Sequence, residues 1–183
     1  YAMQGAVHPV WPGLAQRISP RRAAICERKY ARRSAEVILP TGLSGGGAED
    51  TCHNFLDGND LERRFASADR FAIGELGFGS GLNFLSASAL WRLVRRPGAT
   101  LSFLSVEKFP LRAEDLRRAG AAWPQFAEDV EALARTYPPP VRGFHQMAFA
   151  GGVTLTLALG DAAGLLRGCE ASIDAWFLDG FSP

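Results

Sequence analysis

The chain has 183 residues, of which 47% are hydrophobic, 21% charged and 10% aromatic, and its formal net charge at neutral pH is +1. These values are average for a globular domain, and they exclude collagen-like, coiled-coil and intrinsically disordered chains. A net charge so close to zero gives no overall field that would by itself indicate nucleic acid binding. A chain of this length is expected to fold around one core.

The cysteines and the apolar runs predict the cellular compartment. Cys26, Cys52 and Cys169 are the three cysteines, and they form neither a CxxC pair nor the dense pattern of a disulfide framework. No stretch approaches the run of about 20 apolar residues that a membrane span needs. The first residues also lack the apolar core of a secretory signal. We therefore expect a cytoplasmic protein without a membrane segment.

The first 48 residues are predicted to form an arm and a glycine-rich loop outside the main domain, which we place at residues 49–183. Residues 17–36 hold seven cations and two acids. This excess of positive charge either contacts RNA phosphates or lies in solvent as an arginine-rich tail. Four glycines between residues 42 and 47 predict a flexible loop, because glycine loses the most entropy when it is ordered.

Beyond residue 70, short apolar runs alternate with segments of helical spacing. The runs cover residues 71–74, 101–106, 153–159 and 173–178, and the helical segments cover 82–95 and 111–137. This alternation is typical of a mostly parallel, doubly wound α/β sheet. The second and fourth runs are apolar enough to predict strands buried on both faces. Residues 144–149 and 153–159 flank two glycines, which predicts an antiparallel hairpin inserted before the third parallel strand.

The segment ELGFGSGLN, residues 75–83, joins the first strand to the following helix, which is where open α/β sheets bind ligands. Its alternating glycines allow the backbone to approach a ligand closely, and the free amides at the helix start favour a carboxylate or another anion. Glu75 ends the strand, where it can accept hydrogen bonds from a ligand ammonium group or from loop amides. The GxGxG spacing differs from the GxGxxG that dinucleotide binding requires.

Two further acids end neighbouring strands. Glu107 follows the second run, where a carboxylate can accept hydrogen bonds from both hydroxyls of a ribose. Asp161 follows the third run. An acid at a strand end is also a common helix cap, so each residue alone is ambiguous. Three acids at successive strand ends favour a nucleoside site at this edge of the sheet.

Four segments, FLDGNDLERRF, ELGFGSGLNFL, SVEKFPL and DAWFLDGFSP, resemble the methyltransferase domain of the MnmC family, within the class I S-adenosylmethionine methyltransferases. The resemblance runs from about Glu49 to Pro183, and it implies a Rossmann-like sheet whose last strands this chain lacks. It also implies methyl transfer from S-adenosylmethionine to the aminomethyl nitrogen of 5-aminomethyl-(2-thio)uridine at the tRNA wobble position. An FAD-dependent oxidoreductase, fused or separate, is the implied partner. The implied cofactor-binding residues are Glu75, Gly77, Phe78, Gly79, Gly81, Asn83, Glu107, Lys108 and Asp161.

The resemblance also assigns roles near the end of the chain. Asp179 is expected beside the reacting amine, as the catalytic and substrate-binding residue that orients it, although it can equally cap the turn that follows. Phe181 is expected to stack on the flipped uracil. Trp176 and Phe177 either line the crevice or form strand core.

No metal site is predicted, because His53 and His145 have no partner at a metal-ligand spacing. Two other functions stay open from the residues alone. A methyltransferase fold can serve as a non-catalytic module that binds tRNA or acts as a scaffold. An NAD-dependent oxidoreductase would share the sheet and the acid that binds ribose, but it would need a further glycine at position 82 or 83.

Overall fold

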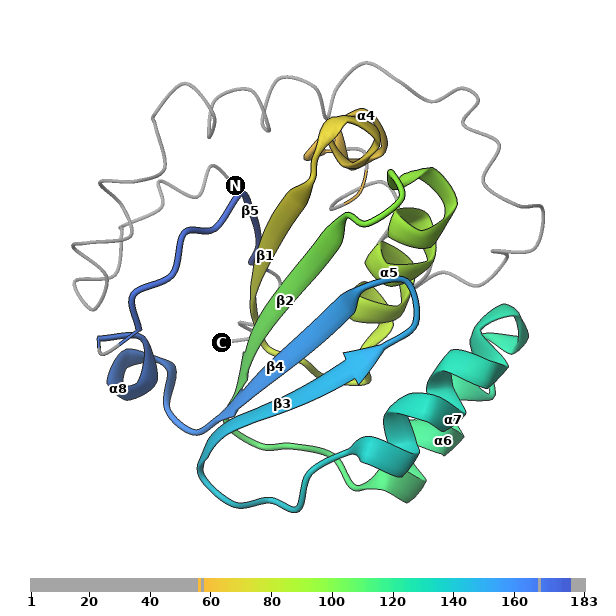
Figure 1. Cartoon of the computed structure of the whole chain (residues 1–183). Coiled ribbons are helices and arrows are strands. Elements are labelled where there is room, and N and C mark those ends of the chain that lie inside the picture. The colour runs from red at the N-terminus through yellow and green to blue at the C-terminus, as the bar shows by residue number, and fades with distance from the viewer. Residues whose placement is uncertain (1–55, 57, 168, 179–183) are drawn as a thin grey trace, which may run out of the picture. The chain divides into compact units, whose positions relative to one another are not determined.

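The structure, a computed structural model, describes residues 56, 58–167 and 169–178. Its strands form one sheet in the order β3-β4-β2-β1-β5, shown in Figure 1. β3 and β4 pair antiparallel, and the other neighbours pair parallel. The strands are β1 (Arg70–Leu76), β2 (Thr100–Glu107), β3 (Gly143–Phe149), β4 (Val153–Leu159) and β5 (Ala175–Phe177). The predicted mostly parallel sheet and the inserted hairpin are confirmed.

The helices fall between these strands in the predicted alternation. The predicted helical segment 111–137 holds three short helices, which end before the run of prolines at 138–140. The described helices are α4 (Leu61–Ser67), α5 (Leu82–Val94), α6 (Ala113–Gly120), the 3₁₀ helix η2 (Pro124–Phe126), α7 (Ala127–Thr136) and α8 (Ala162–Arg167). The predicted boundary at residue 48 lies outside the described residues.

The core lies between the sheet and α5. Phe84 of α5 packs edge-on against Phe103 of β2, with ring centroids 5.4 Å apart, and Phe103 packs in turn against Phe177 of β5 at 5.9 Å. Trp91, about two turns further along α5 than Phe84, is fully buried and contacts Phe65 of α4. These aromatic contacts fix the start of α5 against the carboxyl ends of the central strands.

The prediction that the second run is buried on both faces is wrong. Side chains of β2 alternate, because Leu101 and Phe103 are buried toward α5 while Ser102 is exposed and Leu104 is half-buried. Side chains at alternate positions of a strand share a face, and on the face of Ser102 only Val106, at the end of the run, is buried. The fourth run was also predicted to be buried on both faces, but its last residue, Leu178, is 48% exposed.

Helix α4 was not predicted, and it contacts β1 and the residue that precedes β5. The guanidinium of Arg64 donates a hydrogen bond to the carbonyl oxygen of Asp174 at 2.8 Å and lies 4.7 Å from the ring centroid of Phe71. The Asp174 carboxylate accepts a hydrogen bond from the amide of Ala72 in β1 at 2.9 Å. These contacts join α4, β1 and the residue that precedes β5.

Candidate functional site

The turn between β1 and α5 is built from glycines in the left-handed backbone region. Gly77, Gly79 and Gly81 have φ angles of 87°, 53° and 80°, which L side chains adopt only with strain. The amide of Gly77 donates to the carbonyl oxygen of Val106 at 2.8 Å, so the turn is bound to the end of β2. A Cβ at Gly79 would meet no atom within 4 Å. The turn therefore presents open backbone at Gly79.

Glu107 anchors this turn through its carboxylate. One oxygen accepts the Gly79 amide at 3.1 Å, and the other accepts the Phe109 amide at 2.7 Å. A carboxylate offers about four acceptor positions, so these two bonds leave capacity for a ligand. The predicted proximity of Glu107 to the glycine-rich turn is thus present in the structure.

Glu75 lies in β1 just before the turn, and its side chain is 1% exposed. Its two carboxylate oxygens accept hydrogen bonds from the side-chain amide of Asn83 at 2.9 Å and from the hydroxyl of Ser105 at 2.6 Å. Glu75 therefore joins the ends of β1 and β2 to the first turn of α5. Sequence reasoning missed Ser105, although a serine in a largely apolar run was a signal that it faces a polar partner.

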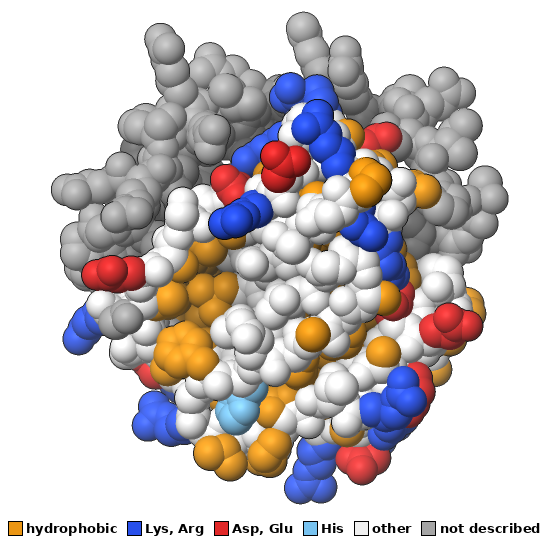
Figure 2. Space-filling view, viewed as in Figure 1, with side chains coloured by type: hydrophobic (Ala, Val, Ile, Leu, Met, Phe, Trp, Pro, Cys, Tyr) orange, Lys and Arg blue, Asp and Glu red, His pale blue; other side chains and the backbone are white. Residues whose placement is uncertain are grey.

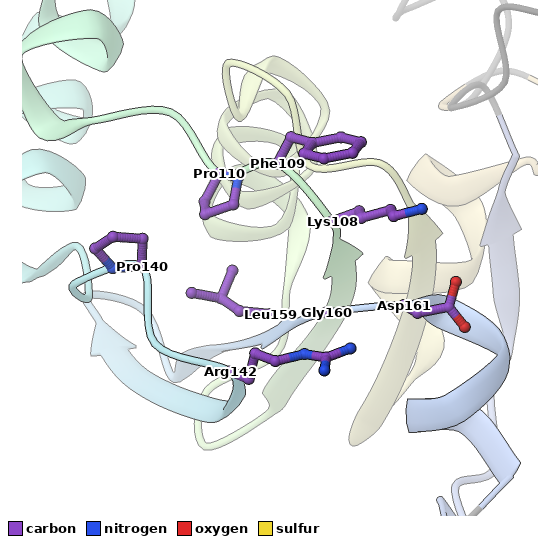
Figure 3. Close-up of a pocket in the computed structure, with 8 residues that line it drawn as sticks. All are labelled: Lys108, Phe109, Pro110, Pro140, Arg142, Leu159, Gly160 and Asp161. Carbon is purple, nitrogen blue, oxygen red and sulfur yellow. The ribbon is translucent and has the colours of Figure 1, made fainter.

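A pocket of about 260 Å³ lies at the carboxyl ends of β2 and β4. Figure 3 shows Lys108, Arg142 and Asp161 with their polar ends directed to the same side. Asp161 also accepts the Gly164 amide at 3.1 Å, so it caps α8 while it lines the pocket. The lining residues are Lys108, Phe109, Pro110, Pro140, Arg142, Leu159, Gly160 and Asp161. Sequence reasoning missed Pro140 and Arg142, which come from the segment before the inserted hairpin.

Tyr137 packs against the glycine-rich turn and was also missed. Its ring stacks on that of Phe78, with centroids 6.1 Å apart and planes inclined by 28°. The hydroxyl is buried without a hydrogen-bond partner among the described residues. Burial, together with the negative charge of Glu107, raises the pKa of Tyr137 to about 12. Tyr137 is therefore neutral across the physiological pH range.

The remaining predicted residues divide into two groups. Asp179, Phe181 and His53 lie outside the described residues and stay predictions. Phe177 is fully buried in the core, and Trp176 covers Gly74 of the neighbouring strand. Phe177 therefore agrees with the interpretation as strand core, and Trp176 is half-buried.

The metal and membrane predictions can be examined over the described part of the chain. Nε2 of His145 lies 2.7 Å from the carbonyl oxygen of Val141. No group of three or more potential metal ligands occurs among the described residues. None of the helices found there is long and apolar enough to cross a membrane.

Comparisons with known proteins agree with this geometry. Residues 124–183 match a family described as S-adenosyl-L-methionine-dependent methyltransferase. The tRNA 5-methylaminomethyl-2-thiouridine biosynthesis bifunctional protein MnmC of Pseudomonas paraeruginosa is 54% identical over 141 residues, and that of Hahella chejuensis is 52% identical over the same length. Each match covers 75% of this chain and 22% of the relative, so the chain spans about a fifth of the relatives' length.

A solved structure gives the same fold. The crystal structure of MNMC2 from Aquifex aeolicus aligns with a TM-score of 0.56 and 22% identity, covering 73% of this chain and 40% of that one. This likeness confirms the predicted Rossmann-like fold class. The resemblance to MnmC predicted from the motifs is confirmed as well, and the family description names the predicted cofactor. The two alternative functions are not favoured by any of these matches.

Proposed function

We propose that this chain, a relative of the MnmC proteins over three quarters of its length, carries the S-adenosylmethionine-dependent methyltransferase step of tRNA wobble-uridine modification. The acceptor is the aminomethyl nitrogen of 5-aminomethyl-(2-thio)uridine. One structural observation supports this most directly. The open glycine-rich turn, the Glu107 carboxylate and Asp161 surround the carboxyl ends of adjacent parallel strands, beside a pocket of about 260 Å³.

The described residues fit S-adenosylmethionine. Glu107 keeps acceptor capacity for the two ribose hydroxyls, and Gly79 leaves open space beside it. The amides at the start of α5, a helix of 13 residues, suit the carboxylate of the methionine part. Lys108 and Asp161 line the pocket in which a nucleoside base would lie. When bound, the cofactor supplies a methyl group attached to a positively charged sulfur.

Glu75 and Asn83 act on the cofactor site indirectly. Their mutual hydrogen bond, at 2.9 Å, joins the end of β1 to the first turn of α5. Because both groups bind protein atoms, we assign them to positioning the glycine-rich turn. Phe78 completes this support, since its ring is buried between the turn and Tyr137.

The substrate amine has to be neutral before it can attack. An alkylamine has an ordinary pKa near 10.4, and its protonated form lacks the lone pair that forms the new carbon–nitrogen bond. Positioning the nitrogen in line with the bond that breaks supplies most of the catalysis in such displacements. We assign the orientation of the amine to Asp179 and stacking of the uracil to Phe181, on the motif resemblance. The products are the methylaminomethyl nucleoside, S-adenosylhomocysteine and a proton.

The partners follow from the same proposal. The relatives are named bifunctional tRNA biosynthesis proteins, which supports tRNA as the substrate. An FAD-dependent oxidoreductase, fused or separate, is the second activity that the motif resemblance implies. We also place the protein in the cytoplasm, where tRNA substrates are modified.

The test uses the full-length protein with undermodified tRNA and S-adenosylmethionine labelled in its methyl group. Label in the wobble nucleoside is the expected result. Asp179→Ala is expected to keep cofactor binding, measured by calorimetry, and to lose methyl transfer. Binding of S-adenosylmethionine without any transfer would favour a non-catalytic module. Tighter binding of NAD than of S-adenosylmethionine would favour an oxidoreductase.

A further inference from the structure

Two short segments, residues 108–112 and 140–144, meet at the pocket and expose apolar side chains around it. We call these segments the rim surface. Six large hydrophobic side chains are exposed among the described residues, and four of them belong to the rim surface. Figure 2 shows apolar side chains gathered at the lower edge of the molecule, over the start of β3. The four are Phe109, at 78% exposure, Val141 at 58%, Phe144 at 53% and Leu111 at 37%.

The charge of the rim surface is entirely positive. Its two segments contain Lys108, Arg112 and Arg142 and no acidic residue. Within the part of the chain that the structure describes, other arginines form the salt bridges, and these three cations form none. Two acids lie next to the rim surface: Glu107 accepts the Phe109 amide, and Asp161 in the pocket lining accepts a backbone amide of α8. The ammonium of Lys108 lies 5.3 Å from the centroid of the Phe109 ring, so Arg112 and Arg142 are the cations that the rim surface offers to a polyanion.

Both segments of the rim surface are held by hydrogen bonds. The Phe109 amide donates to Glu107 at 2.7 Å, and a proline follows it. In the other segment the Val141 amide donates to the Pro139 carbonyl oxygen at 2.7 Å, and Nε2 of His145 lies 2.7 Å from the Val141 carbonyl oxygen. An exposed aromatic residue on a fixed backbone binds a partner with little further loss of entropy.

We propose that the rim surface binds unpaired nucleotides of the RNA substrate, with a base stacked on Phe144 and phosphates beside Arg112 and Arg142. Aromatic residues interleaved with lysine and arginine are the usual surface for single-stranded RNA. Protein interfaces are also enriched in aromatic residues and arginine, so the feature that favours a polyanion is the lack of any acidic residue in the two segments. The inference rests on the proposed function for its choice of RNA, and it adds the surface that would hold the strand beside the pocket.

The test measures RNA binding to the full-length protein by fluorescence anisotropy. The probes are a 17-nucleotide RNA stem-loop and a blunt RNA duplex of the same stem sequence. Phe144→Ala is expected to weaken stem-loop binding by about 5- to 100-fold, as loss of one stacked base does, and to leave duplex binding unchanged. Arg142→Gln is expected to lower the slope of log K against log salt by about 0.7, as loss of one phosphate contact to a single strand does.

Two control variants match these changes away from the rim surface. Leu93→Ala removes an apolar side chain that is 69% exposed on α5, and Arg135→Gln removes an exposed cation in the last turn of α7. Neither is expected to alter stem-loop binding. Equal losses in the control and rim variants would overturn the proposal, and so would equal losses for stem-loop and duplex. A change of oligomeric state in Phe144→Ala, by sedimentation, would point to a protein contact and overturn it as well.

Methyl transfer in the same variants separates the two proposals. If the wild-type protein methylates tRNA while the rim variants bind the stem-loop as it does, the rim surface is not the RNA site and the proposed function stands. If the stem-loop depends on Phe144 and Arg142 while no methyl group is transferred, the rim surface stands and the proposed function fails.

Discussion

Replacement of Ser105 by alanine tests whether the buried Glu75 carboxylate is a structural requirement of the site. Ser105 is fully buried, and its hydroxyl donates a hydrogen bond of 2.6 Å to Glu75, which is 1% exposed. Hydrogen bonds to charged groups contribute about 1.5–3 kcal/mol, and a buried acceptor that loses its donor incurs the whole of that loss. We therefore expect Ser105→Ala to lower the free energy of unfolding by about 2 kcal/mol. For a chain of this size, that corresponds to a fall of roughly 4–8 °C in the melting temperature.

Ser102→Ala is the matched control, because Ser102 lies three residues earlier in the same strand and is exposed. Exposed substitutions of this kind usually change stability by less than about 0.5 kcal/mol. Both variants are measured by equilibrium urea unfolding, with the midpoint compared at constant slope. If Ser105→Ala is no less stable than Ser102→Ala, the Glu75 carboxylate does not depend on this donor and the assignment of its role is refuted.

Three other predictions concern the turn and its surroundings. Glu107→Ala is expected to raise the dissociation constant for S-adenosylmethionine about 10- to 150-fold by calorimetry, since charged hydrogen bonds are lost; an unchanged constant would make Glu107 a turn anchor alone. Gly81→Ala is expected to be at least about 1 kcal/mol more destabilising than Gly98→Ala in urea unfolding. Both glycines have φ of 80°, but only a Cβ at Gly81 meets a neighbour, the ring of Phe78 at 3.0 Å; equal losses would contradict this packing argument. Tyr137 is expected to ionise near pH 12 in an absorbance titration and at lower pH in Glu107→Gln, whereas an ordinary value near 10 would show that its hydroxyl is not buried.

The order of strands and helices could be predicted because apolar runs and glycines follow local rules, whereas strand ends depend on long-range contacts. The first apolar run ends at Gly74 and Glu75 was expected to end the strand, but β1 continues to Leu76. A Cβ at Gly74 would lie 2.6 Å from the ring of Trp176, so this glycine allows a neighbouring strand to pack closely. The fourth apolar run was predicted to start at residue 173, but its strand, β5, begins at Ala175. Asp174, just before it, bonds to Ala72 through both its amide and its carboxylate.

The site residues could likewise be predicted where a local pattern marks them, and not where a long-range contact places them. The glycine-rich turn, Glu107 and Asp161 were found because each follows directly on an apolar run. Ser105 reaches Glu75, 30 residues away in sequence, only through the parallel register of β1 and β2. Arg142 reaches the pocket only because the inserted hairpin returns the chain to the carboxyl end of β4. The partners of such residues become known only with the strand register; the one local signal was the serine within an apolar run at residue 105.

Glu107 also explains how one strand end can serve both the pocket and the rim surface. Its carboxylate accepts an amide from the turn at Gly79 and another from Phe109 in the rim surface. A ligand hydroxyl bound to the same carboxylate would therefore act on both segments at once, since hydrogen bonds that share a charged acceptor are energetically coupled. The placement of an acid at residue 107, directly before the exposed lysine and phenylalanine, thus connects the nucleoside site to the surface on which we place the RNA strand.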